Sequence, residues 1–416
     1  MKKLEIIGGN KLKGTINISG AKNSVVALIP AAILSDKKIK ITNVPDISDV
    51  DSLKTVLEYL NCSVSSTIGT IIIDSSDMNN KPIPVELSSK LRASYYFMGA
   101  LLSKFKKVEI FFPGGCKIGK RPIDIHLDGF IQLGASVKEE KEKIIIEAQE
   151  LLGTDINMRF PSCGATINLM LAAVKANGIT RIINAAKEPE IVNVANLLSN
   201  MGASIIGAGT NIIQIEGGKT LNSATINVIP DRIEAGTYLI AGAMLGEKLK
   251  INNIEPKHLE SLTSALKTSN CNLNIQTDNI VISSPEEAIG LNVITDVFPG
   301  FPTDLQQPMT TYLTQCCGMS TIIENIYENR FLNVKYLNEM NANIRISENK
   351  LNIKGKTPLI GKNVVATDLR GGASVVLAGL VATGKTTITE IEHILRGYDE
   401  IVEKLSSVGA NIKVVE

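Results

Sequence analysis

The sequence has no excess of either charge. Lys and Arg total 43 against 42 Asp and Glu in 416 residues, so the formal net charge is +1 at pH 7. This balance gives no general attraction to nucleic acid or to an acidic membrane surface, and neither is expected as a partner. Any bound anion must therefore be held by a local group of cations.

The chain also lacks a long apolar run. Its first residues reach Gly8-Gly9-Asn10 before an apolar segment of signal-peptide length can form. No later run approaches the roughly 20 apolar residues of a membrane span. We therefore expect a cytoplasmic protein, and 44% hydrophobic content in a chain of this length is typical of two or three well-filled domains.

Cysteines with metal-ligand spacing are missing too. The six cysteines form no CxxC pair and have no ordered spacing with the three histidines. Structural zinc is not expected, and neither is a cofactor or another metal. Cys62 and Cys271 are expected to be buried free thiols.

The most regular feature of the sequence is a repeat. A short signature of Gly or Asn, then a small residue, then a β-run recurs with its first position at residues 61, 134, 202, 270, 341 and 409, which are 68 to 73 residues apart. Gly or Asn after an apolar helical stretch tolerates the left-handed conformation of a helix C-cap. Each signature therefore predicts the end of a helix and the start of a strand.

Each repeat also contains a helix that is apolar on nearly all faces. The six ranges are 25–34, 95–102, 167–174, 238–245, 308–317 and 374–382. Such helices must be buried on every side, which favours helices inside and sheets outside. The sequence thus predicts an α/β protein of six units of about 70 residues, in two lobes of three units with a boundary near residues 230–232. A cleft between such lobes is a usual place for a ligand.

Residues 379–386 match the nucleotide-binding pattern GxxxxGK[ST] letter for letter. A phosphate-binding loop of this kind follows a strand and precedes a helix. The repeat instead places residues 374–382 on a buried helix and residues 383–385 in the turn after it. We interpret the match as a coincidence.

A glycine-rich stretch at residues 113–126 contains Cys116 close to Lys117, Lys120 and Arg121. Its glycines and proline predict an exposed loop. Nearby cations favour the thiolate, which makes a cysteine useful as an acid, base or nucleophile, and they can hold a phosphate or carboxylate. The alternative is a surface loop whose cysteine is incidental.

Four charged residues lie just before or at the start of the apolar helices of their units, where the repeat would gather them around the cleft. They are Lys22, Arg92, Asp304 and Arg370. Ser24 or Asn23 is expected to cap the first helix. Asp304 is interpreted either as a helix N-cap or, with a substrate hydroxyl in reach, as a general base.

Ten motifs in order along the chain resemble the enolpyruvyl transferase family. They are SGAKNS (19–24), LRAS (91–94), PGGCKIGKRPIDIH (113–126), SCGAT (162–166), EPEIV (188–192), PDRIEAGTYL (230–239), FPGFPTD (298–304), ENRF (328–331), ATDLRGGAS (366–374) and RGYD (396–399). The resemblance implies a two-lobed inside-out α/β barrel. Residues 22–229 would form lobe one, which carries the Cys116 loop, and residues 1–21 with 230–416 would form lobe two.

By resemblance, the chain transfers the enolpyruvyl group of phosphoenolpyruvate to the 3-hydroxyl of UDP-N-acetylglucosamine and releases phosphate, the first committed step of peptidoglycan synthesis. These two small molecules are the implied partners, and the sequence is compatible with a monomer. One rival within the family is 5-enolpyruvylshikimate-3-phosphate synthase, which does not need the PGGC loop. The other rival is a non-catalytic nucleotide-sugar sensor on the same scaffold.

The resemblance also implies roles. Cys116 would be the general acid, Asp304 would accept the sugar hydroxyl proton, and Lys22 and Arg396 would join them in catalysis. The residues implied to bind the substrates are Lys22, Asn23, Arg92, Arg121, Pro122, Ile123, Asp124, Ile125, Ser162, Gly164, Asp304, Ile326, Asp368, Arg370 and Arg396. One departure is Phe160, beside Arg159, where some members carry a lysine that contacts the diphosphate.

A direct test concerns the cysteine. Fosfomycin, an epoxide that mimics phosphoenolpyruvate, is expected to alkylate Cys116 when UDP-N-acetylglucosamine is present, because the thiolate is the nucleophile. Intact mass spectrometry should show one added fosfomycin on the wild type and none on Cys116→Ala. An unmodified wild type, or the same adduct on the variant, would contradict the prediction.

Overall fold

The computed structural model describes residues 2–88, 92–111, 123–328 and 330–416. The contacts divide these residues into two compact units, each with its own hydrophobic core. The first unit comprises residues 20–229, and the second comprises the N-terminal residues up to Ser19 together with 230–416. Gly20 and Ala21 were expected in the other half. They belong to the first unit because Ala21 is part of its core and its N–H donates to Ile229 O at 2.7 Å.

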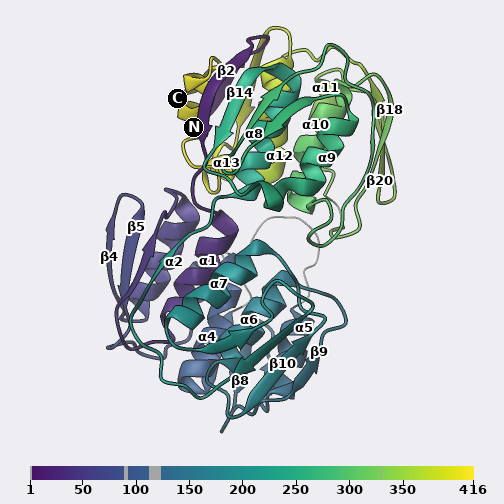
Figure 1. Ribbon diagram of the computed structural model, residues 1–416. Coiled ribbons are helices and arrows are strands. Elements are labelled where there is room, and N and C mark those ends of the chain that lie inside the picture. The colour runs from purple at the N-terminus through teal and green to yellow at the C-terminus, as the bar shows by residue number, and fades with distance from the viewer. Residues whose placement is uncertain (1, 89–91, 112–122, 329) are drawn as a thin grey trace. The chain divides into compact units, whose positions relative to one another are not determined.

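Three inner helices form the centre of each unit (Figure 1). In the first unit they are α1 (Lys22–Ala32), α4 (Tyr96–Phe105) and α6 (Cys163–Ala173), and α4 contacts both others. In the second unit they are α8 (Arg232–Leu245), α10 (Gln306–Thr314) and α12 (Leu369–Val381), which all contact one another. Residues 165–173 of α6 are all buried, as are all nine residues of α10. The predicted burial of these helices on every side is confirmed.

Each unit has three sheets. In the first unit they run β13-β3-β5-β4, β6-β8-β7 and β11-β12-β10-β9. The strands are β3 (Ile39–Thr42), β4 (Ser63–Thr67), β5 (Thr70–Asp74), β6 (Lys107–Phe111), β7 (Ser136–Glu139), β8 (Lys143–Glu147), β9 (Asp155–Asn157), β10 (Ile179–Ile183), β11 (Ser204–Ile206), β12 (Ile212–Glu216) and β13 (Ala224–Asn227).

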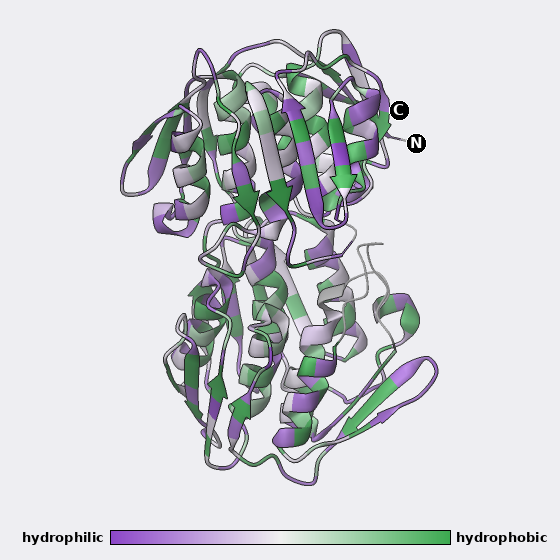
Figure 2. Ribbon diagram, turned by 90° about the vertical axis from the view of Figure 1, so that its right-hand side faces the viewer, coloured by the Kyte–Doolittle hydropathy of each residue, from purple (hydrophilic) through white to green (hydrophobic). Residues whose placement is uncertain are grey.

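In the second unit the orders are β21-β22-β1-β23, β15-β16-β14-β2 and β17-β18-β20-β19. The strands are β1 (Lys3–Ile7), β2 (Leu12–Asn17), β14 (Gly246–Asn252), β15 (Asn272–Ile275), β16 (Asn279–Ser283), β17 (Asn292–Ile294), β18 (Gly318–Ile323), β19 (Ile344–Ser347), β20 (Lys350–Gly355), β21 (Asn363–Val365), β22 (Lys385–Thr389) and β23 (Asn411–Val415). Isoleucine and leucine alternate with polar residues along many of these strands, so one face packs on the helices and the other faces outward (Figure 2).

Segments from the two ends of each unit close its ring of sheets. β1 pairs antiparallel with β22 and β23, and β2 pairs parallel with β14, so both chain termini lie in the second unit (Figure 1). In the first unit, β13 pairs parallel with β3 in the same way. The N-terminal strands thus complete two sheets whose other strands lie more than 220 residues later in the chain.

The six repeat signatures end six outer helices. These are α2 (Ser48–Tyr59), α5 (Asp124–Gln132), α7 (Pro189–Asn200), α9 (Glu260–Thr268), α11 (Asn333–Glu339) and α14 (Ile401–Ser407). Every signature Gly or Asn has a positive φ, from 65° at Asn61 to 110° at Gly202. The next N–H bonds the carbonyl five residues back at 2.9–3.1 Å in all six, as in Cys62 to Leu57 and Ala410 to Leu405. These are Schellman motifs, and the predicted helix ends are confirmed.

The remaining short helices are α3 (Val85–Ser88), α13 (Glu392–Leu395), η1 (Arg92–Tyr95), η2 (Pro256–Leu259) and η3 (Thr303–Leu305). In residues 379–386, which match the nucleotide-binding pattern, α12 ends at Val381, Gly384 forms a turn with φ +88°, and β22 begins at Lys385. This helix–turn–strand order confirms that the match is a coincidence. Across the part of the chain that the structure describes, none of the helices has the length and apolar character needed to cross a membrane.

The repeat predicts a difference between its glycine and asparagine positions. Gly202→Ala should lower the free energy of unfolding by about 1 to 2 kcal/mol, because an L-residue is strained in the left-handed region. A Cβ there would lie 3.4 Å from Thr220 O, an ordinary contact, so the cost is one of backbone conformation. Asn61→Gly, at φ 65°, serves as the control: it keeps a residue that tolerates this conformation and loses only the exposed bond from Asn61 Nδ2 to Asp77 O, so it should destabilise less than Gly202→Ala. Urea unfolding measures both, and equal stability of Gly202→Ala and wild type would contradict the prediction.

Candidate active site

The predicted site residues are distributed over both units. Lys22, Asn23, Ile123, Asp124, Ile125, Ser162 and Gly164 lie in the first unit, and Asp304, Ile326, Asp368, Arg370 and Arg396 in the second. Cys116, Arg121 and Pro122 lie outside the described residues. Arg92 begins η1, and its backbone alone is described.

Asp304 lies between two arginines in the second unit. It belongs to η3, directly before α10. Its Oδ1 accepts a hydrogen bond from Arg330 Nη2 at 2.7 Å, and its Oδ2 accepts from Arg370 Nη2 at 2.9 Å and Nε at 3.3 Å. Both arginine side chains are 3% exposed, whereas Asp304 is 24% exposed. Neither η3 nor α10 has a side-chain cap bond, so the N-cap interpretation of Asp304 is wrong.

The two arginines control the charge state of Asp304. Burial raises the pKa of this carboxyl, but the opposite charges of Arg370 and Arg330 and their hydrogen bonds outweigh burial and hold the pKa well below its usual value. Asp304 is therefore ionised and can accept a hydrogen bond from a hydroxyl. While both arginines face it, its low proton affinity makes it a weak base.

Asp368 holds the start of the helix that carries Arg370. Its Oδ1 accepts from the backbone N–H groups of Arg370 and Gly371, both at 3.0 Å, and caps α12. Its Oδ2 accepts from Gln307 Nε2 at 3.2 Å and from Thr367 Oγ1 at 3.1 Å. With a side chain 1% exposed and four bonds to the protein, Asp368 positions Arg370.

An aromatic ring supports the same arginine. The Arg370 guanidinium lies 5.3 Å from the centre of the Tyr398 ring, and the Tyr398 hydroxyl is 2.9 Å from Thr237 Oγ1 on α8. Arg396, two residues before Tyr398, follows α13 and is partly buried. The RGYD motif therefore brings an aromatic support for Arg370 and a second arginine to one short segment.

Sequence reasoning missed Arg330 and Glu324. Arg330 lies in the quoted ENRF motif, but no sequence spacing indicates its contact with Asp304. It also lies 5.1 Å from the Tyr327 ring centre. Glu324 accepts the N–H of the predicted contact residue Ile326 at 2.9 Å. A single charged residue in an irregular segment carries no sequence pattern that would predict which residue it contacts in the fold.

In the first unit, Lys22 is the first residue of α1 and forms an ion pair with Asp49, in the first turn of α2. Their side chains are 12% and 5% exposed. The prediction that Ser24 or Asn23 caps α1 is wrong, because Ala21 is the N-cap and both residues lie inside the helix. Ser24 Oγ instead donates to Asn193 Oδ1 at 2.6 Å.

A buried histidine lies against the start of α6. Ser162 caps this helix by accepting from Ala165 N–H at 3.3 Å. Asn168 Nδ2 lies 2.9 Å from His126 Nδ1, and Asn168 Oδ1 accepts from Gly99 N–H at 2.8 Å. These bonds make Nδ1 the acceptor and leave the proton on Nε2. A Cβ on Gly164 would lie 3.3 Å from the His126 ring, so the ring fits against glycine.

The segment just before this histidine corrects a prediction. Asp124, Ile125 and His126 were expected in a loop, but they form the first turn of α5, where an acidic residue is favoured. Ile123 is the residue before this helix. Arg159 Nη2 pairs with Asp124, and Arg159 Nη1 pairs with Asp128 at 2.9 Å. The cation beside Phe160 is thus engaged by two carboxylates.

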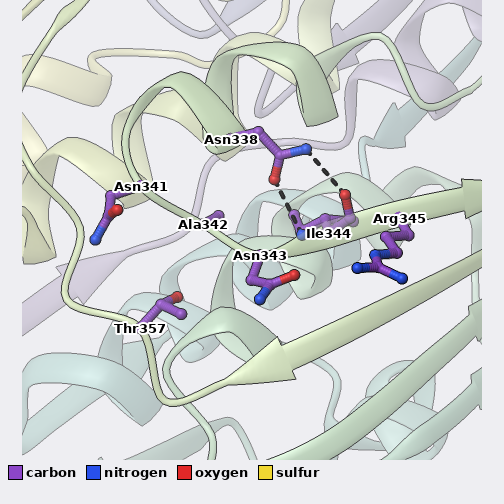
Figure 3. A pocket seen from close by; sticks show the side chains of 7 residues that line it. All are labelled: Asn338, Asn341, Ala342, Asn343, Ile344, Arg345 and Thr357. Carbon is purple, nitrogen blue, oxygen red and sulfur yellow. Dashed lines mark hydrogen bonds between the residues drawn. The ribbon is translucent and has the colours of Figure 1, made fainter.

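A polar hollow of about 390 Å³ lies elsewhere in the second unit, beside α11 and β19 (Figure 3). It is lined by Asn338, Asn341, Ala342, Asn343, Ile344, Arg345 and Thr357. Asn338 bridges the N–H and C=O of Ile344 at 3.0 and 2.9 Å. None of the predicted site residues that the structure describes is among the residues that line this hollow. Among the described residues, His, Cys, Asp and Glu form no group of three placed to hold a metal ion.

Comparison with known proteins identifies the class. A family model described as EPSP synthase (3-phosphoshikimate 1-carboxyvinyltransferase) matches residues 6–405, and the chain belongs to this family of enolpyruvyl transferases. The solved structure of the enolpyruvyl transferase NikO from Streptomyces tendae has a TM-score of 0.90 at 24% identity, covering 100% of this chain and 99% of that one. EPSP synthase from Acinetobacter baumannii has a TM-score of 0.76 at 17% identity and full coverage of both chains. The predicted two-lobed fold class is confirmed.

The names of two similar curated proteins state a more specific activity. The chain is 49% identical over 412 residues to UDP-N-acetylglucosamine 1-carboxyvinyltransferase 2 of Geobacillus kaustophilus, covering 99% of this chain and 96% of that protein. It is 48% identical over 413 residues to the protein of the same name in Bacillus subtilis, with the same coverage.

The buried histidine gives a pH prediction. Burial lowers the pKa of His126 to about 4, against about 6.5 in an unfolded chain. Between these values the unfolded chain binds a proton that the folded protein does not, so stability falls as pH is lowered from 6.5 to 4, by roughly 3 kcal/mol at most. His126→Gln should lose this dependence in urea unfolding at pH 7 and pH 4.5, whereas the control His393→Gln should keep it. Equal pH dependence of wild type and His126→Gln would exclude this role.

Proposed function

We propose that the chain transfers the enolpyruvyl group of phosphoenolpyruvate to the 3-hydroxyl of UDP-N-acetylglucosamine and releases phosphate, a step of peptidoglycan synthesis. The observation that carries the proposal is the 49% identity, over nearly the whole length, to a relative named for this carboxyvinyl transfer. Both substrates are metabolites of the cell interior, and we propose a cytoplasmic location on that ground.

The second unit offers the cations that phosphoenolpyruvate requires. This substrate carries a phosphate and a carboxylate, and planar guanidinium groups bind both in a two-pronged manner. Arg330 and Arg370 are already oriented by Asp304, and Arg370 also by the Asp368 cap and the Tyr398 ring. Such preorganised charge stabilises a transition state without further rearrangement. We assign Lys22, Arg121 and Arg396 to the same substrate by resemblance.

The proposed reaction has two stages. In the addition, Cys116 gives a proton to the methylene carbon of phosphoenolpyruvate, the sugar oxygen bonds to its central carbon, and the hydroxyl proton passes to Asp304. In the elimination, the bond from the central carbon to the phosphate oxygen breaks, and phosphate leaves with the proton that Asp304 had accepted. The methyl carbon returns a proton to the Cys116 thiolate as the double bond forms again. Cys116 takes its role from the resemblance alone.

The basicity of Asp304 follows from its partners. When the anionic groups of phosphoenolpyruvate bind Arg370 and Arg330, the positive charges of these two arginines are shared between Asp304 and the substrate. The pKa of Asp304 then rises toward a value at which it can accept the hydroxyl proton. Binding of the first anion thus prepares the base for the second substrate.

The alternative acceptor is shikimate 3-phosphate, which the description of the family model favours. The identities favour UDP-N-acetylglucosamine, because relatives named for it are 48–49% identical while the solved EPSP synthase is 17% identical. A non-catalytic sensor is the second alternative. Intact ion pairs around Asp304 favour an enzyme over a sensor.

Phosphate release tests the proposal. The wild type should release phosphate with phosphoenolpyruvate and UDP-N-acetylglucosamine, and not with shikimate 3-phosphate. Asp304→Asn should lower kcat by about 10²- to 10⁴-fold because the proton acceptor is lost. The exposed control Asp77→Asn should be unchanged.

Two outcomes would overturn the proposal. Turnover of shikimate 3-phosphate in place of the sugar nucleotide would assign the other activity. Binding of UDP-N-acetylglucosamine without phosphate release would identify a sensor. Cys116→Ser in the same assay tests the proton donor, and undiminished release would remove Cys116 from the mechanism.

A further inference from the structure

We propose that Glu324 is a positioning residue of this site, which ties the segment 298–305 that carries Asp304 to the segment that carries Ile326 and Arg330. The effect of Glu324 on catalysis rests on the function proposed above. The tie itself rests on contacts within the second unit alone.

Glu324 follows β18 and is 3% exposed. Its carboxylate accepts four hydrogen bonds. Oε1 accepts from Thr295 Oγ1 at 2.9 Å and from the backbone N–H groups of Ile326 at 2.9 Å and Tyr327 at 3.1 Å. Oε2 accepts from Thr303 Oγ1 at 2.9 Å. The four donors come from three separate stretches of chain, so this one side chain fixes their relative positions.

The four partners all act as donors, and this requires an acceptor-only group. A carboxylate has two oxygens with enough lone pairs for all four bonds. Glutamine has the same shape, but its NH₂ would face either Thr303 or the two backbone N–H groups. The first orientation reverses the bond with Thr303, and the second replaces acceptance from Thr295 and the two backbone N–H groups by a donor that faces donors, so buried groups are left poorly paired. The four donors around this side chain therefore specify glutamate.

A short chain of bonds leads from Glu324 to Asp304. The Thr303 hydroxyl donates a hydrogen bond to Glu324 Oε2, so its oxygen is oriented to accept from Arg330 Nη1 at 2.8 Å. The other nitrogen of that guanidinium, Nη2, donates to Asp304 Oδ1 at 2.7 Å. If Thr303 instead receives a hydrogen bond from an amide, its hydroxyl must rotate and its bond to Arg330 weakens. Glu324 thus sets the position of Arg330 against Asp304 through Thr303.

Ile326 depends on the same side chain. The N–H groups of Ile326 and Tyr327 donate to Glu324 Oε1, and the N–H of Asn325 donates to Thr295 Oγ1 at 2.9 Å. Three successive backbone amides are therefore held by this network. Tyr327 in turn lies beside Arg330. Loss of Glu324 should therefore loosen the segment at 325–328 as well as Arg330.

The experiment compares Glu324→Gln, Thr303→Val, their double variant and Thr303→Ser, with Glu339→Gln as a matched control at an exposed position on α11. Phosphate release should show kcat/KM at least tenfold lower for Glu324→Gln and for Thr303→Val, with kcat affected more than KM. If both act through one bond chain, the double variant should be no worse than about the poorer single variant. Thr303→Ser, which keeps the hydroxyl, should retain most activity.

Hydrogen exchange supplies a readout that does not depend on the reaction. Glu324→Gln should speed amide exchange in peptides covering 298–306 and 324–328, and Glu339→Gln should not. If the wild type releases no phosphate but Glu324→Gln still exchanges faster than the wild type, the proposed function is rejected and the tie made by Glu324 is kept. Unchanged exchange, multiplicative losses in the double variant, or a Thr303→Ser as impaired as Thr303→Val would overturn the positioning role. Should Glu324→Gln not fold, the Thr303 pair still decides the question.

Discussion

Each inner helix has to be covered on all sides, and the rest of the molecule follows from that constraint. A helix with apolar residues around its whole circumference cannot face water, since each buried leucine or isoleucine side chain is worth about 1.5 to 3 kcal/mol relative to exposure. Three such helices in contact cover one another on the inside, and three sheets cover them outside. The polar groups of the site are consequently found at helix starts, such as Asp304 before α10 and Asp368 before α12.

Much of this arrangement was readable in the sequence. The positive φ at Asn61, Gly134 and their four counterparts is required by one turn. Such a turn selects Gly or Asn at that position, so the sequence itself indicates it. The contact of Arg330 with Asp304 is different, because it joins residues 26 apart through two irregular segments. Nothing in the composition of either segment specifies it, and the family resemblance located the motif without its partner.

The inner helix α10 shows a second limit. Its residues Gln306, Gln307, Thr310 and Thr311 are all fully buried, so this helix is buried as predicted although it is not apolar on nearly all faces. Thr311 bonds to Ser374 at 2.8 Å and Gln307 to Asp368 at 3.2 Å on neighbouring elements, whereas Gln306 and Thr310 bond to each other within the helix at 2.9 Å. Hydrogen bonds between side chains therefore make the burial of these polar residues possible, and the burial of α10 does not depend on apolar residues alone.

The way in which β1 and β2 complete the second unit has a consequence for synthesis on the ribosome. The partners of β1 are β22 and β23, so a strand made among the first ten residues waits until residues 385–415 emerge. At about 5 to 20 residues per second this wait lasts roughly 20 to 80 seconds. The first unit, whose last strand β13 ends at Asn227, has all its strands far sooner. Order of assembly thus differs from order of translation: β1 is translated before the other described strands but is among the last to be paired, and its unpaired edge has to stay free of other chains until then.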